Sequence, residues 1–138
     1  MLRELKTFLL LPPFMFVLDY IWLGFVSGGV YKKDLEGLLR LSGGDMDPVV
    51  WAALVVYLAI PLGIVVLALP RVAVGSPLRS GLFWGMVYGL IVYTIYEMTN
   101  YSLLDGWPLR LVFVDIAWGG FLNAATTAFA AVVRQRLG

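Results

Sequence analysis

Neither cysteine nor histidine occurs among the 138 residues, and charged side chains make up only 14% of them. The missing cysteines exclude disulfide bonds and thiolate nucleophiles. The missing histidines remove the commonest general base and the commonest ligand of zinc, copper and non-haem iron. A net charge of +1 gives no reason to expect a nucleic-acid partner. Any chemistry must therefore use carboxylates, phenols, hydroxyls, amides and a few basic groups.

Apolar residues take the place of the missing charges. They make up 61% of the chain, and the mean hydropathy is +0.88, whereas soluble domains are about half apolar. Four long apolar runs alternate with short polar segments, and each run is close to the roughly 20 residues that a membrane-spanning helix needs. We expect residues 1–138 to form one all-α domain, a four-transmembrane-helix bundle. The predicted spans are residues 7–27, 48–69, 80–104 and 109–133.

The first apolar run follows two basic residues, Arg3 and Lys6, as in a secretory signal peptide. It differs from a signal peptide because it contains Asp19 and is longer than a typical apolar h-region of about 7–15 residues. We therefore interpret it as a retained first helix. In the polar segment that follows, leucines at helical spacing predict a short amphipathic helix over residues 31–41, ended by Gly43-Gly44.

The basic residues are distributed unequally between the two ends of the predicted bundle. Four spans place both termini on one side of the membrane, and that side carries six basic residues and one acid. These residues are Arg3, Lys6, Arg71, Arg79, Arg134 and Arg136, with Glu4. The other side has four basic residues and five acids: Lys32, Lys33, Arg40 and Arg110, with Asp34, Glu36, Asp45, Asp47 and Asp105. The positive-inside rule then predicts that both termini are cytoplasmic.

Three acids lie inside the predicted spans, namely Asp19, Glu97 and Asp115. Counted at 1.5 Å per residue, each is roughly 9–12 Å below the outer edge of the membrane. Facing lipid would cost several kcal/mol for each acid, so we expect all three to face the bundle interior. The alternative to a functional role is that the three acids only make hydrogen bonds that stabilise the structure.

Three neighbouring carboxylates cannot all stay charged in an apolar bundle without compensation. The nearest basic residue, Arg110, is predicted near the outer interface, where it can remain among the headgroups. The remaining options are shared protons, a bound metal ion or a cationic substrate. Oxygen ligands alone favour Mg²⁺, Ca²⁺ or Mn²⁺, with Asp19, Glu97 and Asp115 as the candidate ligands.

The third predicted span combines small and polar residues on one helical face. Its first half has glycines at every fourth position, and its second half has the groups that surround Glu97. Polar and aromatic residues at similar depths in the other spans complete the expected ligand-binding shell. The candidate ligand-binding residues are Asp19, Tyr20, Trp22, Tyr93, Tyr96, Glu97, Thr99, Asn100, Asp115, Trp118 and Asn123.

The glycines of the third span, Gly81, Gly85 and Gly89, allow another helix to approach closely. That helix can belong to the same bundle or to a second copy of the chain, so a homodimer through these glycines is one expectation. A second pattern links Asp19-x-x-Trp22 with Asp115-x-x-Trp118, each followed soon by a glycine. Since the two helices run in opposite directions, an inverted repeat and a coincidence are both open.

Several motifs occur in an order that resembles a known family. They are Leu18-Asp19-Tyr20-Ile21-Trp22-Leu23-Gly24, Tyr31, Tyr96-Glu97-Met98-Thr99-Asn100, Gly106-Trp107-Pro108 and Asp115-Ile116-Ala117-Trp118-Gly119. The chain resembles the domain of unknown function 2177 family, a bacterial family of small predicted membrane proteins. The resemblance implies an integral protein of the bacterial inner membrane and brings no activity with it. Glu97 stands where the family pattern more often has Asp, which keeps the charge and lengthens the side chain.

Three classes of function remain. The first is a membrane protein whose acidic pocket binds or transports a cation, a proton or a cationic small molecule. The second is a small membrane enzyme for a lipid or isoprenoid substrate, in which Asp19, Glu97 and Asp115 are the candidate catalytic residues, acting by acid–base or divalent-metal chemistry. The third is a non-catalytic assembly partner in the lipid bilayer.

Topology gives the first testable prediction. A reporter that fluoresces only in the cytoplasm should be active when fused after Gly138, because both termini are predicted there. A reporter active only in the periplasm should work when inserted near Gly44. The opposite pattern would place the three acids in the cytoplasmic half of the membrane.

Overall fold

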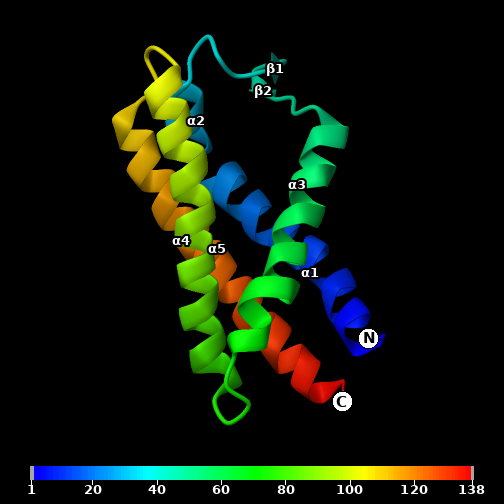
Figure 1. Cartoon of the computed structure of the whole chain (residues 1–138). Helices are drawn as coiled ribbons and strands as arrows, with labels where there is room; N and C mark the ends of the chain where they lie inside the picture. Colours follow the sequence, from blue (N-terminus) through cyan, green and yellow to red (C-terminus); the bar gives the residue numbers. More distant parts are fainter. Residues whose placement is uncertain (1, 138) are drawn as a thin grey trace.

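A computed structural model of the chain describes residues 2–137 (Figure 1). Within these residues, four helical stretches are long and apolar enough to cross a membrane. They are Leu2–Val26, Val50–Arg71, Pro77–Leu103 and Leu109–Arg136. The predicted all-α architecture with four membrane spans is confirmed. The first helix begins earlier and the last ends later than the apolar runs indicate, because polar residues extend both helices.

Two of the four spans change helix type near one end. Helix α1 (Leu2–Ile21) continues as a π-helical turn, η1 (Trp22–Val26), and α3 (Val50–Gly63) continues as a second π-helical turn, η2 (Ile64–Ala68). A 3₁₀ turn, η3 (Leu69–Arg71), completes the second span. Pro61 lies just before η2 and cannot donate a backbone hydrogen bond, so the regular pattern is already interrupted there. Helices α4 (Pro77–Leu103) and α5 (Leu109–Arg136) are uninterrupted.

The polar segment between the first two spans differs from the prediction. A helix over residues 31–41 is wrong: α2 covers Gly28–Asp34, and a small hairpin of β1 (Leu41–Ser42) and β2 (Asp45–Met46) follows. Gly37 has a φ of +82°, which a continuing helix does not allow. Gly43 and Gly44 have φ values of +59° and +86° and form the two-residue turn between the strands. The glycine pair therefore makes a hairpin and does not end a helix.

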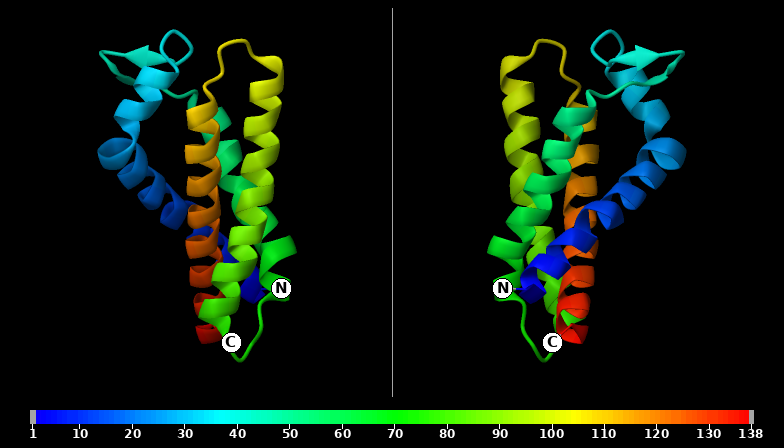
Figure 2. Two further views of the ribbon diagram at one scale, coloured as in Figure 1. Left: turned by 90° about the vertical axis from the view of Figure 1, so that its left-hand side faces the viewer. Right: turned by 90° about the vertical axis from the view of Figure 1, so that its right-hand side faces the viewer.

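The chain termini lie at the same end of the bundle (Figure 1). The turn between η3 and α4 is at that end too, and the hairpin and the α4–α5 turn are at the other (Figure 2). This arrangement is the one expected for four spans. It groups the basic residues of the termini with those of the second turn.

Helix α5 is the central element of the bundle. It contacts α1, α2, α4, η2 and η3, and it has more buried residues than any other described helix. Its lower half meets Leu11 and Met15 of α1 and Ile64 of η2 in the hydrophobic core. The upper half packs mainly against α4, which runs alongside it over its whole length (Figures 1 and 2).

The three glycines of α4 form the contact surface with α5. A Cβ atom added at Gly85 would lie 2.3 Å from the Asn123 carbonyl oxygen, and one at Gly89 would lie 2.2 Å from the Gly119 carbonyl oxygen. One at Gly81 would lie 2.7 Å from a backbone atom of α5. The glycine ladder is therefore used within the chain. The homodimer expected through it is not supported, because a second chain could reach these glycines only by displacing α5.

Replacing Gly85 with Leu should destabilise the bundle by roughly 3 kcal/mol or more, because the new side chain must separate two helix backbones. Gly24→Leu is the matched control, since an added Cβ at Gly24 meets nothing within 4 Å. Thermal unfolding in detergent compares the two variants. Equal melting temperatures would show that α4 and α5 do not pack in this way.

Candidate functional site

A cavity of about 470 Å³ lies in the upper half of the bundle, among α1, α2, α3, α4 and α5. Two carboxyl groups line it, those of Asp19 and Asp115, and no basic side chain is among its lining residues in the described part of the chain. Five aromatic side chains also line the cavity: Trp22, Tyr31, Tyr93, Tyr96 and Trp118. The remaining wall is aliphatic. The cavity therefore combines negative charge with aromatic and apolar surfaces.

Both carboxylate oxygens of Asp19 accept hydrogen bonds from aromatic side chains. The Tyr57 hydroxyl donates to Oδ2 at 2.8 Å, and the Trp118 indole Nε1 donates to Oδ1 at 2.8 Å. Tyr57 comes from α3 and Trp118 from α5, so Asp19 links three of the four spans. Hydrogen bonds to a charged group typically contribute about 1.5–3 kcal/mol each, and here they compensate for the loss of water around the carboxylate.

The carboxyl group of Asp115 accepts a hydrogen bond from a residue outside the membrane spans. The Tyr31 hydroxyl of α2 donates to Asp115 Oδ1, and the Trp22 indole nitrogen lies 3.4 Å from the same hydroxyl, to which it donates. Burial and the nearby charge of Asp115 raise the pKa of the Tyr31 phenol, so it keeps its proton for this bond. A two-pronged ion pair between Arg110 and Asp34, with distances of 3.0 and 2.6 Å, fixes α2 against α5.

The two Asp-x-x-Trp motifs meet inside the cavity. The rings of Trp22 and Trp118 are stacked, with centroids 4.4 Å apart and planes within 2° of parallel. Trp118 donates directly to the acid of the other motif, and Trp22 reaches the acid of its counterpart through Tyr31. The similar motifs therefore serve reciprocal roles, with each tryptophan serving the opposite aspartate.

Glu97 is buried but does not line the cavity. Only 1% of its surface is exposed, and Trp107 of the α4–α5 turn donates from Nε1 to its Oε2 at 2.9 Å. The three acids belong to three different membrane spans. Within residues 2–137, no three acidic side chains are grouped as a metal site requires. Asp19 and Asp115 share the cavity, and Glu97 is not among its lining residues.

The structure separates the predicted ligand-binding residues into two groups. Asp19, Trp22, Tyr93, Tyr96, Asp115 and Trp118 line the cavity. Of the others, Tyr20 is 61% exposed on the outer surface of α1, and Thr99 is also exposed. Asn123 is fully buried against α4, where its Nδ2 donates to the Gly119 carbonyl oxygen at 2.8 Å. Glu97 and Asn100 are likewise absent from the cavity wall.

Sequence reasoning does not include three of the four donors, Tyr31, Tyr57 and Trp107, among the candidate site residues. Tyr57 is the clearest case, since it and Trp51 have the only polar side-chain groups in the uncharged run at 49–69. A phenol in the middle of such a run needs a hydrogen-bonding partner, and that signal was available. Tyr31 and Trp107 occur among the family-like motifs, but their partners are distant in sequence or beyond a turn.

Helices α3 and α4 separate around the cavity. Their Cα atoms do not approach within 8 Å in the described residues, and the Tyr88 hydroxyl bridges them lower down by donating to the Ile60 carbonyl at 3.4 Å. Above this bridge, Val56 and Ala59 of α3 face Val92 of α4 across the cavity. Figure 1 shows α3 leaning away from α4 toward the hairpin end. The cavity wall on this side therefore consists of aliphatic side chains from two helices whose backbones are not in close contact.

Comparison with known protein families identifies the family of this chain. A model described as "Predicted membrane protein (DUF2177)" matches residues 4–132. The matched region contains all three acids of the membrane spans and the four aromatic residues that donate to them. This match confirms the resemblance drawn from the motifs. No curated protein and no solved structure matches the chain.

Removing the Tyr57 hydroxyl tests the Asp19 contacts. Tyr57→Phe should lower the free energy of unfolding by about 1–3 kcal/mol, because the half-buried carboxylate of Asp19 loses one of its donors. Tyr20→Phe, one residue from Asp19 but on the outer surface, should change it by less than about 0.5 kcal/mol. Unfolding in mixed detergent measures both variants. A larger effect at Tyr20 would contradict the arrangement.

Proposed function

The chain belongs to this family of predicted membrane proteins, and on that premise we propose that it binds a small organic cation through Asp19 and Asp115. The observation that carries the proposal is the cavity itself: two carboxyl groups and five aromatic rings, with no basic side chain in its described wall. Aromatic faces attract ammonium-type cations, by about 2 kcal/mol or more when water is excluded. The carboxylates supply the opposite charge.

An organic cation suits this cavity better than a metal ion. The acids are not grouped for coordination, and a volume of about 470 Å³ is in the usual range for a small-molecule pocket. Both oxygens of Asp19 already accept hydrogen bonds from indole and phenol groups. That pattern supports a fixed counter-charge more than a group that must gain and lose a proton during catalysis.

The ligand is proposed to arrive between α3 and α4, whose backbones are not in close contact. Aliphatic residues of both helices flank this route, so an entering molecule crosses an apolar surface before it meets the carboxylates. An amphiphilic cation, with a charged head and an apolar body, can follow that route from the bilayer. We therefore place the ligand in the class of lipophilic ammonium or phosphonium compounds.

Tetraphenylphosphonium is a suitable probe. Equilibrium dialysis against the full chain in nanodiscs of zwitterionic lipid should show saturable binding. Asp115→Asn should weaken it about tenfold or more, because a difference of 1.4 kcal/mol in attraction is tenfold in affinity. Asp105→Asn is the matched control: it removes one acid from the turn at the same end of the bundle, and Asp105 does not line the cavity.

Tetraphenylborate, an anion of the same shape, separates charge recognition from partitioning into lipid. It should neither bind saturably nor displace the phosphonium ion. If both ions bind equally, or if the Asp105 control weakens binding as much as the Asp115 variant, the cavity is not a cation site.

A further inference from the structure

A second cavity, of about 310 Å³, lies at the opposite end of the bundle from the acidic one. Three parts of the chain form it: the start of α1, the turn from η3 into α4, and the last turns of α5. The turn provides apolar walls, including Leu69, Val72 and Val74. The charged groups on its wall are Arg3 and Arg134. The cavity thus combines positive charge with an apolar surface.

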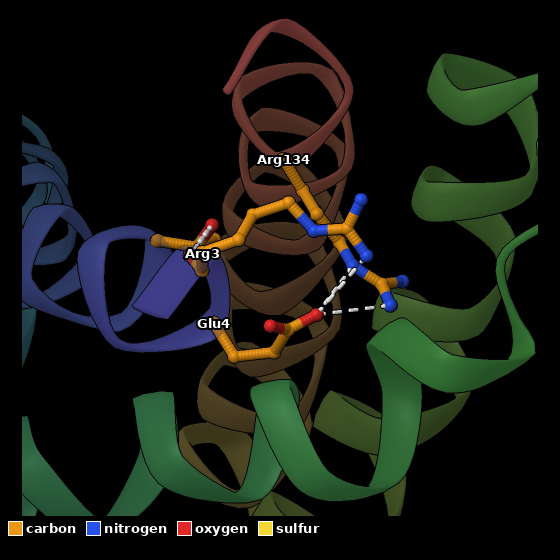
Figure 3. Close-up of polar contacts among 4 residues, drawn as sticks. Arg3, Glu4 and Arg134 are labelled. Atoms are coloured by element: carbon orange, nitrogen blue, oxygen red, sulfur yellow. Dashed lines mark hydrogen bonds and ion pairs between the residues drawn. The ribbon is translucent and has the colours of Figure 1, made fainter. Parts of the chain in front are cut away.

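The two arginines are fixed by one carboxylate. Glu4 Oε1 accepts from Arg3 Nη2 at 3.3 Å and from Arg134 Nε and Nη2 at 3.2 Å (Figure 3). The bridge connects the first turn of α1 with the last turn of α5. Within this trio, two positive charges face a single negative charge, so a net positive charge remains beside the cavity.

Donors for a further anion are available on these groups. A guanidinium has five N–H groups, and the bonds to Glu4 use those on Nη2 of Arg3 and on Nε and Nη2 of Arg134. Helix α4 adds to the positive field, because its first residue, Pro77, lines the cavity and its N-cap Ser76 makes no side-chain capping bond. The N-terminus of a helix carries about half a positive charge.

We propose that this cavity binds the phosphate group of an anionic phospholipid, with Arg3 and Arg134 as its ligands. The cavity lies where the first and third membrane spans begin and the second and fourth end, which is the level of the lipid headgroups. Arginine forks match phosphate oxygens, and the apolar wall of the η3–α4 turn suits the upper part of an acyl chain. The site is independent of the organic-cation cavity, which lies at the other end of the molecule.

Native mass spectrometry of the full chain, titrated with phosphatidylglycerol and separately with phosphatidylcholine, tests the proposal. Phosphatidylglycerol should bind at least about tenfold more tightly. The double variant Arg3→Gln/Arg134→Gln should abolish most of that preference, by roughly tenfold, since charge-assisted bonds to phosphate are lost. Lys6→Gln/Arg136→Gln removes two charges from the same end but not from the cavity, and it should change binding less than about twofold.

The Arg3→Gln/Arg134→Gln variant also loses both ion pairs to Glu4, which can prevent folding. A second pair of variants therefore leaves these ion pairs intact. Val74 is 84% exposed at the cavity rim, so substitution there leaves the bundle intact. Val74→Glu should weaken phosphatidylglycerol binding several-fold more than Val74→Gln does, because both variants lose the apolar side chain but only Glu adds charge repulsion. Two results would overturn the proposal. One is an equal loss of phosphatidylglycerol affinity in Val74→Glu and Val74→Gln, and the other is an equal loss in the Arg3/Arg134 and Lys6/Arg136 double variants.

Soluble phosphates distinguish the two sources of the anion. Glycerol 1-phosphate and inorganic phosphate should not displace phosphatidylglycerol at millimolar concentration, because they lack the acyl chain that contacts the apolar wall. Displacement by either compound as efficiently as by the lipid would overturn the assignment to a phospholipid.

Discussion

The structure depends on how aromatic donors bind three carboxyl groups within the membrane spans, of which Glu97 is buried and Asp19 and Asp115 are half-buried. A carboxylate in an apolar bundle is strongly unfavourable unless hydrogen bonds replace its water. Every such acid here accepts from an indole or phenol on another part of the chain. The pairs are Tyr57 and Trp118 with Asp19, Tyr31 with Asp115, and Trp107 with Glu97. The donors come from the second and fourth spans, from α2 and from the α4–α5 turn. The same hydrogen bonds that satisfy the acids therefore also position those elements.

Close packing on one side of α5 and open packing on the other create the cavity. The glycines of α4 bring its backbone against α5, and Gly119 of α5 leaves room for the Tyr93 ring, which would otherwise lie 2.1 Å from an added Cβ. Tyr93 is thereby directed into the cavity. Helix α3 contacts α1 and stays away from α4 in its upper half. The acidic cavity results from this uneven packing.

The sequence was informative where composition and periodicity determine the outcome. The apolar runs predicted four spans, the inward-facing acids were expected from the cost of exposing them to lipid, and the motifs identified the family. Helical spacing indicates a face but not its partner, so Thr99 and Tyr20 are expected in the ligand-binding shell, whereas neither lines the cavity. Tyr57 was missed because its partner, Asp19, is on another span. The hairpin at Gly43-Gly44 was read as a helix end because glycine pairs serve both roles.

The central claim is that Asp19 and Asp115 form one charged site. A double-mutant cycle on tetraphenylphosphonium affinity, with Asp19→Asn, Asp115→Asn and the combined variant, measures their coupling directly. Residues that share one ligand should be non-additive, so the combined loss should be smaller than the sum of the single losses by at least about 0.5 kcal/mol. Strictly additive losses, or single variants that bind as tightly as the unaltered chain, would contradict the account.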